Sequence, residues 1–201
     1  MKKIGMDFDN TIVSYDDLFH EIATEQKLIP ENFPHSKLLI RDYLRKYNKD
    51  ELFTLIQAEV YGKRIIEASP APNVDLAIKE LISIGWDVNI ISHKSLYPYK
   101  GPKYDLHKSA ILWLEKNNFF DVKNVGLSKD KVHFNLTKEE KINKIENIGC
   151  DYFIDDLPEI LKLINKKTIK ILYSPQNNYK DLDYIILNKW ENLINILNIR
   201  E

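Results

Sequence analysis

The chain has 201 residues, of which 44% are hydrophobic and 29% are charged. This length and composition indicate one globular domain with room for an inserted subdomain. Lys and Arg together number 29 against 30 for Asp and Glu, so the formal net charge is -1. A chain this close to neutrality lacks the field that draws proteins to nucleic-acid polymers or anionic membranes, and we expect neither as a partner.

The cysteine content and the N-terminal region are typical of a cytoplasmic protein. Cys150 is the single cysteine, which excludes an internal disulfide and a cysteine-based metal site. Asp7 and Asp9 interrupt the N-terminal region before the apolar core of a signal peptide could develop. No apolar run approaches the roughly 20 residues that span a bilayer. We therefore expect a cytoplasmic location, while the sequence carries no signal for the oligomeric state.

In chain order, the first predicted element is a short apolar strand over residues 3–8 that ends in acidic residues. Residues 13–69 show only helical patterns, with apolar side chains recurring at helical spacing. Pro70 and Pro72 then mark a boundary. We therefore predict a core formed by residues 1–12 and 70–201, and a helical insertion formed by residues 13–69.

After the prolines, helices and strands alternate. Asn73 can cap a helix that Gly85 ends, Thr137 and Glu140 have the spacing of a capping box, and Pro158 can open a further helix. Strands are predicted over residues 86–92, 132–136, 151–154, 169–173 and 184–187, and another helix over residues 106–117. This alternation predicts an α/β fold with a Rossmann-like parallel sheet that is covered on both faces.

Polar side chains follow three of the predicted strands. Asp7 ends the first strand, Ser92 ends the strand over 86–92, and Asp155 with Asp156 ends the strand over 151–154. A lysine, Lys138 or Lys141, lies near the start of the helix between the last two. Ligands of open α/β sheets bind beyond the carboxyl ends of the strands, so we expect these groups to converge on one site.

The chemistry of these residue types is that of phosphoryl transfer. An aspartate such as Asp7 is a competent nucleophile toward a phosphoryl group. Asp9 lies on the same side of an extended chain, where it could protonate the leaving oxygen and then activate water. Asp7, Asp155 and Asp156 supply the hard oxygen ligands that suit Mg²⁺, and clustered carboxylates require a cation. The Ser92 hydroxyl and the lysine could stabilise charge on the phosphate.

This ordered set resembles the haloacid dehalogenase superfamily of phosphotransferases. The matching residues are DFDNT at residues 7–11, IIS ending at Ser92, the lysine near a helix start, and FIDD ending at Asp156. The resemblance implies that Asp7 is nucleophile and metal ligand, and that Asp9 is the acid/base and gives its backbone carbonyl to the metal. Ser92 and the lysine would hold phosphate. Further candidate phosphate-binding residues are Thr11 and His93, although a solvated loop explains His93 equally well.

Three details of the resemblance leave alternatives. We favour Lys141 over Lys138, because its fourteen-residue separation from Asp155 is similar to that of nucleotidase-type relatives. Asp156 would contact the metal and Asp155 would hold a metal-bound water, with Glu159 as a possible extra ligand. The insertion resembles the small helical cap of that family, which closes over the site and selects substrates. Its polar side chains are either substrate contacts or an ordinary helix face; they are Gln57, Tyr61, Lys63 and Arg64.

The predicted function is therefore that of a Mg²⁺-dependent phosphohydrolase acting on a small phosphomonoester through an aspartyl-phosphate. A nucleoside monophosphate is the first expected substrate and a sugar phosphate the second. A phosphomutase of the same fold would also keep Asp9, whereas a dehalogenase resembles relatives that lack this second acid. A non-turnover, receiver-like phosphate-binding module is a further alternative. In receivers the acidic pair ends the first strand and the phosphorylated Asp comes later, the reverse of the order here.

Overall fold

The computed structural model describes residues 1–176 and 184–197. The remaining parts of the expected core, residues 177–183 and 198–201, lie outside the described residues. Within the described part of the chain, no helix has the length and apolar character that crossing a membrane requires.

The chain divides into two compact units. The first contains Met1–Val13, Pro70–Lys94 and the chain from Asn117 onward, and the second contains Ser14–Ser69 and Ser95–Lys116. Residues 95–116, which the sequence analysis assigned to the core, thus group with the helical insertion. Each unit draws on segments that are far apart in the sequence.

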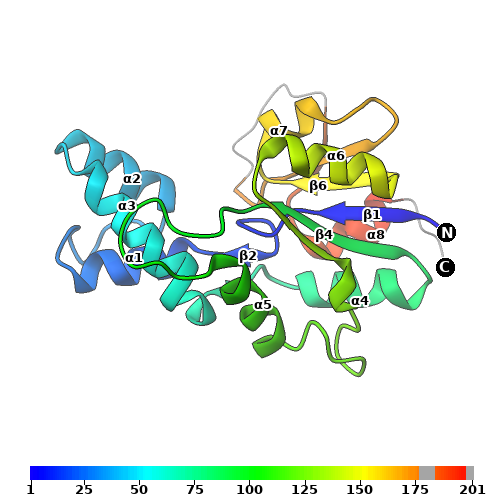
Figure 1. Ribbon diagram of the computed structural model, residues 1–201, viewed down its shortest axis with the longest axis horizontal. Helices are drawn as coiled ribbons and strands as arrows, with labels where there is room; N and C mark the ends of the chain where they lie inside the picture. Colours follow the sequence, from blue (N-terminus) through cyan, green and yellow to red (C-terminus); the bar gives the residue numbers. More distant parts are fainter. Residues whose placement is uncertain (177–183, 198–201) are drawn as a thin grey trace. The chain divides into compact units, whose positions relative to one another are not determined.

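The first unit is built on a six-stranded sheet in the order β5-β4-β1-β6-β7-β8, in which every pairing is parallel. The strands are β1 (Lys3–Met6), β4 (Asp87–His93), β5 (Val132–Asn135), β6 (Tyr152–Asp155), β7 (Ile169–Tyr173) and β8 (Ile185–Leu187). β1 lies between β4 and β6 (Figure 1). In β1, Met6 pairs with Ile90 of β4 on one side and with Ile154 of β6 on the other. The parallel sheet confirms the predicted Rossmann-like α/β fold.

Helices cover both faces of this sheet. The helices α6 (Lys138–Ile148) and α7 (Pro158–Leu163) pack on one face (Figure 1). The core between them and the sheet consists of Ile91, Ile145, Cys150, Phe153, Leu161, Ile164 and Leu172. The helix α4 (Val74–Ser83) packs on β4 and contacts η4 (Trp190–Asn192) and α8 (Leu193–Ile196). The short turn η3 (Lys129–Lys131) precedes β5.

The second unit is helical. Its elements are α1 (Asp16–Glu25), α2 (Lys37–Lys46), α3 (Asp50–Ala58), the π-helical turn η1 (Glu59–Lys63), the short η2 (Ile65–Glu67) and α5 (Leu106–Lys116). The two-residue strands β2 (Val13–Ser14) and β3 (Ser69–Pro70) pair at the ends of the insertion, so the expectation of helices alone over 13–69 is wrong at its two ends. These strands are too short for a hydrophobic period to be visible in the sequence.

Side-chain contacts explain why α5 belongs to the second unit. Trp113 is fully buried, and its indole N–H donates to the carbonyl of Ala68 at 2.8 Å. A Cβ added to Gly62 would lie 2.6 Å from the Tyr104 side chain. Because Gly62 has no side chain, the segment Ser95–Lys116 can approach η1 closely. The periodicity of an amphipathic helix predicts its buried face but not the layer that this face contacts.

The predicted helix termini are largely confirmed. Thr137 and Glu140 form both hydrogen bonds of a capping box, and Pro158 occupies the first turn of α7. Gly85 follows α4 with a φ of 83°. Asn73 precedes α4, but the expectation that its side chain caps the helix is wrong. Asn73 has a left-handed backbone with φ of 61°, and its side chain donates to Glu191 instead.

Candidate active site

The carboxyl ends of β1, β4 and β6 bring the predicted polar residues together in the first unit. β1 ends at Met6 rather than at residue 8, but the Asp7 N–H continues the pairing and donates to the Ile154 carbonyl at 2.9 Å. Asp7 and Asp155 therefore lie on neighbouring strand ends. Ser92 lies on β4, on the other side of β1.

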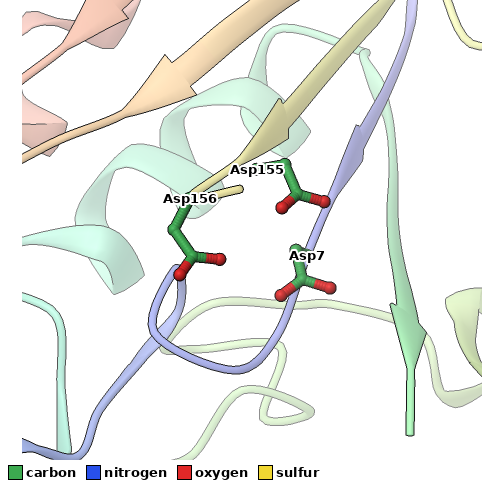
Figure 2. A group of neighbouring side chains, drawn as sticks. All are labelled: Asp7, Asp155 and Asp156. Atoms are coloured by element: carbon green, nitrogen blue, oxygen red, sulfur yellow. The ribbon is translucent and has the colours of Figure 1, made fainter. Parts of the chain in front are cut away.

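Three carboxylates form a cluster at this edge, as Figure 2 shows. Asp7, Asp155 and Asp156 each offer one carboxylate oxygen, and these oxygens all lie within 4.8 Å of one another. Asp7 and Asp155 are buried and Asp156 is half-buried. The Thr11 hydroxyl lies 3.5 Å from Oδ1 of Asp156, at the far end of hydrogen-bond distance. Such a group of hard oxygen donors has the composition of a divalent-cation site.

Lys141 lies beside this cluster. Its Nζ is 2.6 Å from Oδ1 of Asp7 and 2.6 Å from Oδ2 of Asp155. The side chain is 2% exposed, and Nζ lies 5.4 Å from the centre of the Phe153 ring. Burial opposes the charge on Lys141, but the two carboxylates outweigh it and raise the pKa of the ammonium above its usual value. Lys141 therefore stays charged at neutral pH.

The surroundings of Asp155 favour its neutral form, whereas those of Lys141 favour the charged form. Burial and the neighbouring charge of Asp7 raise the pKa of Asp155 to about 7, against the effect of Lys141 and of a hydrogen bond from the Leu157 N–H. This shift means that one ammonium does not compensate the buried carboxylates fully. Additional positive charge at this place would favour the ionised form of Asp155.

The structure separates the two candidate lysines. Lys138 lies 3.9 Å from Glu159, and both side chains are half-exposed or more. Lys141 is the one that contacts Asp7 and Asp155, one helical turn after the cap at Thr137. In the part of the chain that is described, Glu159 is not a member of the carboxylate cluster.

The hydroxyl of Ser92 is buried without a hydrogen-bond partner among the described residues. Leaving a buried hydroxyl without a hydrogen bond costs about 1–3 kcal/mol. An acceptor such as a phosphate oxygen could remove this cost by accepting a hydrogen bond from Ser92. Asn135, at the end of β5, donates to the carbonyls of Ser92 and His133 at 3.1 and 3.2 Å. These bonds fix the backbone of β4 at Ser92.

The second predicted acid has a partner of its own. Both carboxylate oxygens of Asp9 accept hydrogen bonds from Nζ of Lys94, at 2.8 and 2.9 Å. The Asp9 side chain is not among the three described carboxylates that could share a metal ion. His93 is exposed, and its Nε2 lies 3.1 Å from the carbonyl of Leu136, to which it donates. His93, the last residue of β4, thus contacts the residue that directly follows β5.

Comparisons with known proteins place this geometry in context. No family model matches the sequence. The protein named "Putative nucleotidase OB0422" from Oceanobacillus iheyensis is 24% identical over 185 residues, which cover 88% of each chain. Among solved structures, a phosphoserine phosphohydrolase-like protein from Francisella tularensis aligns with a TM-score of 0.60 at 12% identity, over 98% of this chain and 100% of the other. The "putative HAD-hydrolase YfnB" from Bacillus subtilis, described as bound to magnesium, aligns with a TM-score of 0.58 at 14% identity, over 98% and 99%.

The chain has the fold of the haloacid dehalogenase (HAD) superfamily. The structural likeness extends over nearly the whole chain, so it includes both units and not the sheet alone. Within this HAD fold, the carboxylate cluster and Lys141 come from the motifs that carried the resemblance in the sequence. The fold prediction is confirmed on this basis.

Two contacts of this HAD-fold site escaped the sequence analysis. Lys94 is buried and pairs with Asp9, although it is not among the site residues assigned from the sequence. A signal was present, because Lys94 follows Ser92 by two residues and side chains two apart in an extended chain share a side. Asn135 carried no comparable signal, because its role depends on carbonyl groups of other strands.

In the helical unit of this HAD-fold protein, two of the polar candidates have structural partners. Arg64 binds three carboxylates, those of Glu21, Glu25 and Glu67, at 2.5–2.6 Å. Tyr61 packs its ring edge-on against Tyr15 at 4.9 Å between ring centres. These contacts tie α1 to the turns after α3. They support the interpretation of these side chains as part of the unit's own packing.

Proposed function

We propose that the protein is a Mg²⁺-dependent phosphohydrolase that cleaves a small phosphomonoester through an aspartyl-phosphate on Asp7. The observation that carries the proposal is the placement of Lys141, which lies 2.6 Å from both Asp7 and Asp155 beside the three-carboxylate cluster. A nucleophile, a buried cation and metal-binding oxygens at one strand edge are the groups that phosphoryl transfer needs.

The donor set supports a divalent cation. Four carboxylates, those of Asp7, Asp9, Asp155 and Asp156, lie at this strand edge with two ammonium groups, those of Lys94 and Lys141. Two negative charges remain, which matches one Mg²⁺ held by Asp7, Asp155 and Asp156. When bound, Mg²⁺ would neutralise and orient the oxygens of the substrate phosphate.

The side chains then have the following roles. The carboxylate of Asp7 attacks phosphorus while the bond to the leaving oxygen breaks, and Asp9, which must enter this step in its protonated form, gives this oxygen its proton and becomes the carboxylate. In the second half, Asp9 takes a proton from a water molecule as it attacks phosphorus, and the bond to Asp7 breaks. The Ser92 hydroxyl and the Lys141 ammonium donate hydrogen bonds to the phosphate oxygens on which negative charge develops.

For the substrate, we propose a nucleoside monophosphate first and a sugar phosphate second. The name of the Oceanobacillus relative supports the nucleotide, and the similarity to the phosphohydrolase-like structure supports a phosphomonoester in general. We also propose that the helical insertion, extended by residues 95–116, is the unit that selects the substrate, as caps of this family do. A cytoplasmic location fits such a substrate.

Phosphate release tests this proposal directly. Purified protein would be assayed with nucleoside monophosphates, sugar phosphates and 4-nitrophenyl phosphate, with Mg²⁺ and with a chelator. We expect metal-dependent release that Asp7→Asn abolishes, whereas Asp75→Asn, an acid in the first turn of α4, leaves it unchanged. Transfer of the phosphoryl group to another position of the substrate would favour a phosphomutase. A stable phosphoprotein without turnover would favour the receiver-like module.

A further inference from the structure

The Lys94 ammonium forms an ion pair with the Asp9 carboxylate, and 85 residues separate the two in the sequence. The Lys94 Nζ lies 2.8 Å from Oδ1 and 2.9 Å from Oδ2 of Asp9, so both oxygens are held by one ammonium group. A single contact to one oxygen would allow the carboxylate to turn. Contacts to both oxygens keep the open end of the carboxylate directed at the ammonium group.

The pair is not a surface salt bridge. The Lys94 side chain is 3% exposed, and its Nζ lies 5.4 Å from the centre of the Phe8 ring. A charged lysine is rarely buried unless a partner compensates for lost hydration, whereas exposed pairs contribute little. The Asp9 side chain is 23% exposed, so it keeps some contact with solvent while the side chain of its partner is buried.

The backbone on both sides of the pair is also fixed. The Lys94 N–H donates to the Asn135 carbonyl at 2.8 Å, which extends the pairing of β4 with β5 beyond His93. On the other strand end, Asp9 forms a β-bridge with Val13. The pair therefore connects two anchored segments, and it keeps the carboxylate of Asp9, two residues after Asp7, directed at Lys94.

We propose that Lys94 is a positioning residue that orients the Asp9 carboxylate for its proton transfers, above all for taking the proton from the attacking water. This role rests on the proposed phosphohydrolase function and adds a residue to it. A base acts only when its oxygen lies within hydrogen-bond distance of the proton it removes, and small misplacements of a catalytic group slow reactions strongly. Lys94 acts through Asp9 in this account.

The two halves of the reaction separate this role from others. With 4-nitrophenyl phosphate the leaving group is stable without a proton, so formation of the aspartyl-phosphate does not need Asp9. Breakdown of the aspartyl-phosphate by water still needs it. Loss of Lys94 should therefore lower kcat and KM together for this substrate and leave kcat/KM unchanged.

The experiment compares the wild-type chain with Lys94→Met in steady-state and rapid-quench kinetics on 4-nitrophenyl phosphate with Mg²⁺. We expect kcat to fall by about 10- to 100-fold and kcat/KM to stay within about threefold, with a burst of nitrophenol as the phosphoenzyme accumulates. Lys131→Met is the matched control, because Lys131 pairs with Asp87 at 2.9 Å at the other end of β4. This control should leave all three quantities unchanged.

Several outcomes overturn the proposal. An unchanged kcat in Lys94→Met excludes the role, and a fall of kcat/KM equal to that of kcat means that Lys94 binds phosphate or supports the fold. In the Asp9→Asn background Lys94→Met should have no further effect, and a further tenfold loss would contradict action through Asp9. If circular dichroism shows that Lys94→Met does not fold, Lys94→Gln is measured in the same way. Absence of turnover by the wild-type chain would overturn the proposed phosphohydrolase function itself.

Discussion

The Nζ of Lys141 lies 2.6 Å from Oδ1 of Asp7, although 134 residues separate the two in the sequence. The same Nζ contacts Asp155, so one buried ammonium joins the ends of β1 and β6 to the first turns of α6. Without it, two buried carboxylates would face each other on neighbouring strands. Folding of the sheet edge and formation of the candidate site therefore depend on the same contact.

Replacing Lys141 should lower the free energy of unfolding. Lys141→Met removes the shared partner of two buried carboxylates, and breaking a buried ion pair costs about 3–5 kcal/mol of unfolding free energy. Lys138→Met is the control, because its exposed partner Glu159 lies 3.9 Å away and such pairs contribute about 0–1 kcal/mol. Urea unfolding with a chelator present measures the difference. Equal losses in the two variants would contradict the assignment of the buried contact to Lys141.

The raised pKa of Asp155, about 7, predicts how stability depends on pH in the absence of metal. An unfolded Asp titrates near pH 4, so the folded state binds this proton more tightly than the unfolded state does. The resulting contribution to stability is present below about pH 4 and is lost as the pH rises through 7. Urea unfolding of wild type in chelator should therefore show this loss, and Asp155→Asn should reduce it.

Stabilisation by Mg²⁺ should increase with rising pH, because a divalent cation favours ionised carboxylates. Thermal melts with and without Mg²⁺ should show a larger rise in Tm at pH 8 than at pH 5 for the wild-type chain. A Tm gain that is equal at the two pH values, or that persists in Asp7→Asn/Asp156→Asn, would contradict binding at this cluster.

Gly5 of β1 leaves room for the Phe153 ring, over which Lys141 lies. A Cβ at position 5 would approach Phe153 to 2.6 Å and the Cys150 sulfur to 3.2 Å. Gly5→Ala should therefore cost about 1–3 kcal/mol of unfolding free energy, the usual range for overpacking a core. The smaller side chain in Gly5→Ala/Phe153→Leu should relieve part of this cost. Strictly additive losses in the double variant would exclude the steric explanation.

Much of the fold and the site could be predicted because the signals are local. The alternation of strands and helices gave the parallel sheet, and the position of Asp7, Ser92 and Asp155 at strand ends gave a common edge. The fourteen-residue spacing favoured Lys141, the lysine that the structure places between Asp7 and Asp155. The inferences about the sheet and the strand ends use residues that are close in sequence or a rule about parallel strands, whereas the choice of Lys141 rests on the family resemblance.

The features that were missed depend on contacts between distant segments. The grouping of α5 with the second unit depends on the bond from Trp113 to Ala68, 45 residues away. The side chain of Asn73 bonds to Glu191, 118 residues away, instead of capping its own helix. Burial of Lys94 depends on Phe8 and Asp9, and 85 residues separate Lys94 from Asp9. The two-residue period of a strand places Lys94 on the same side as Ser92, but periodicity and capping preferences do not identify the distant partner in any of these pairs.

The central claim is that Asp7 carries the phosphoryl group during turnover, and trapping the intermediate tests it most directly. The protein would be mixed with 4-nitrophenyl phosphate and Mg²⁺, quenched during turnover, reduced with borohydride and digested for mass spectrometry. Reduction of an aspartyl-phosphate converts that residue to homoserine, and we predict this conversion at position 7. Conversion at Asp9, Asp155 or Asp156, or turnover without any converted residue, would contradict the account.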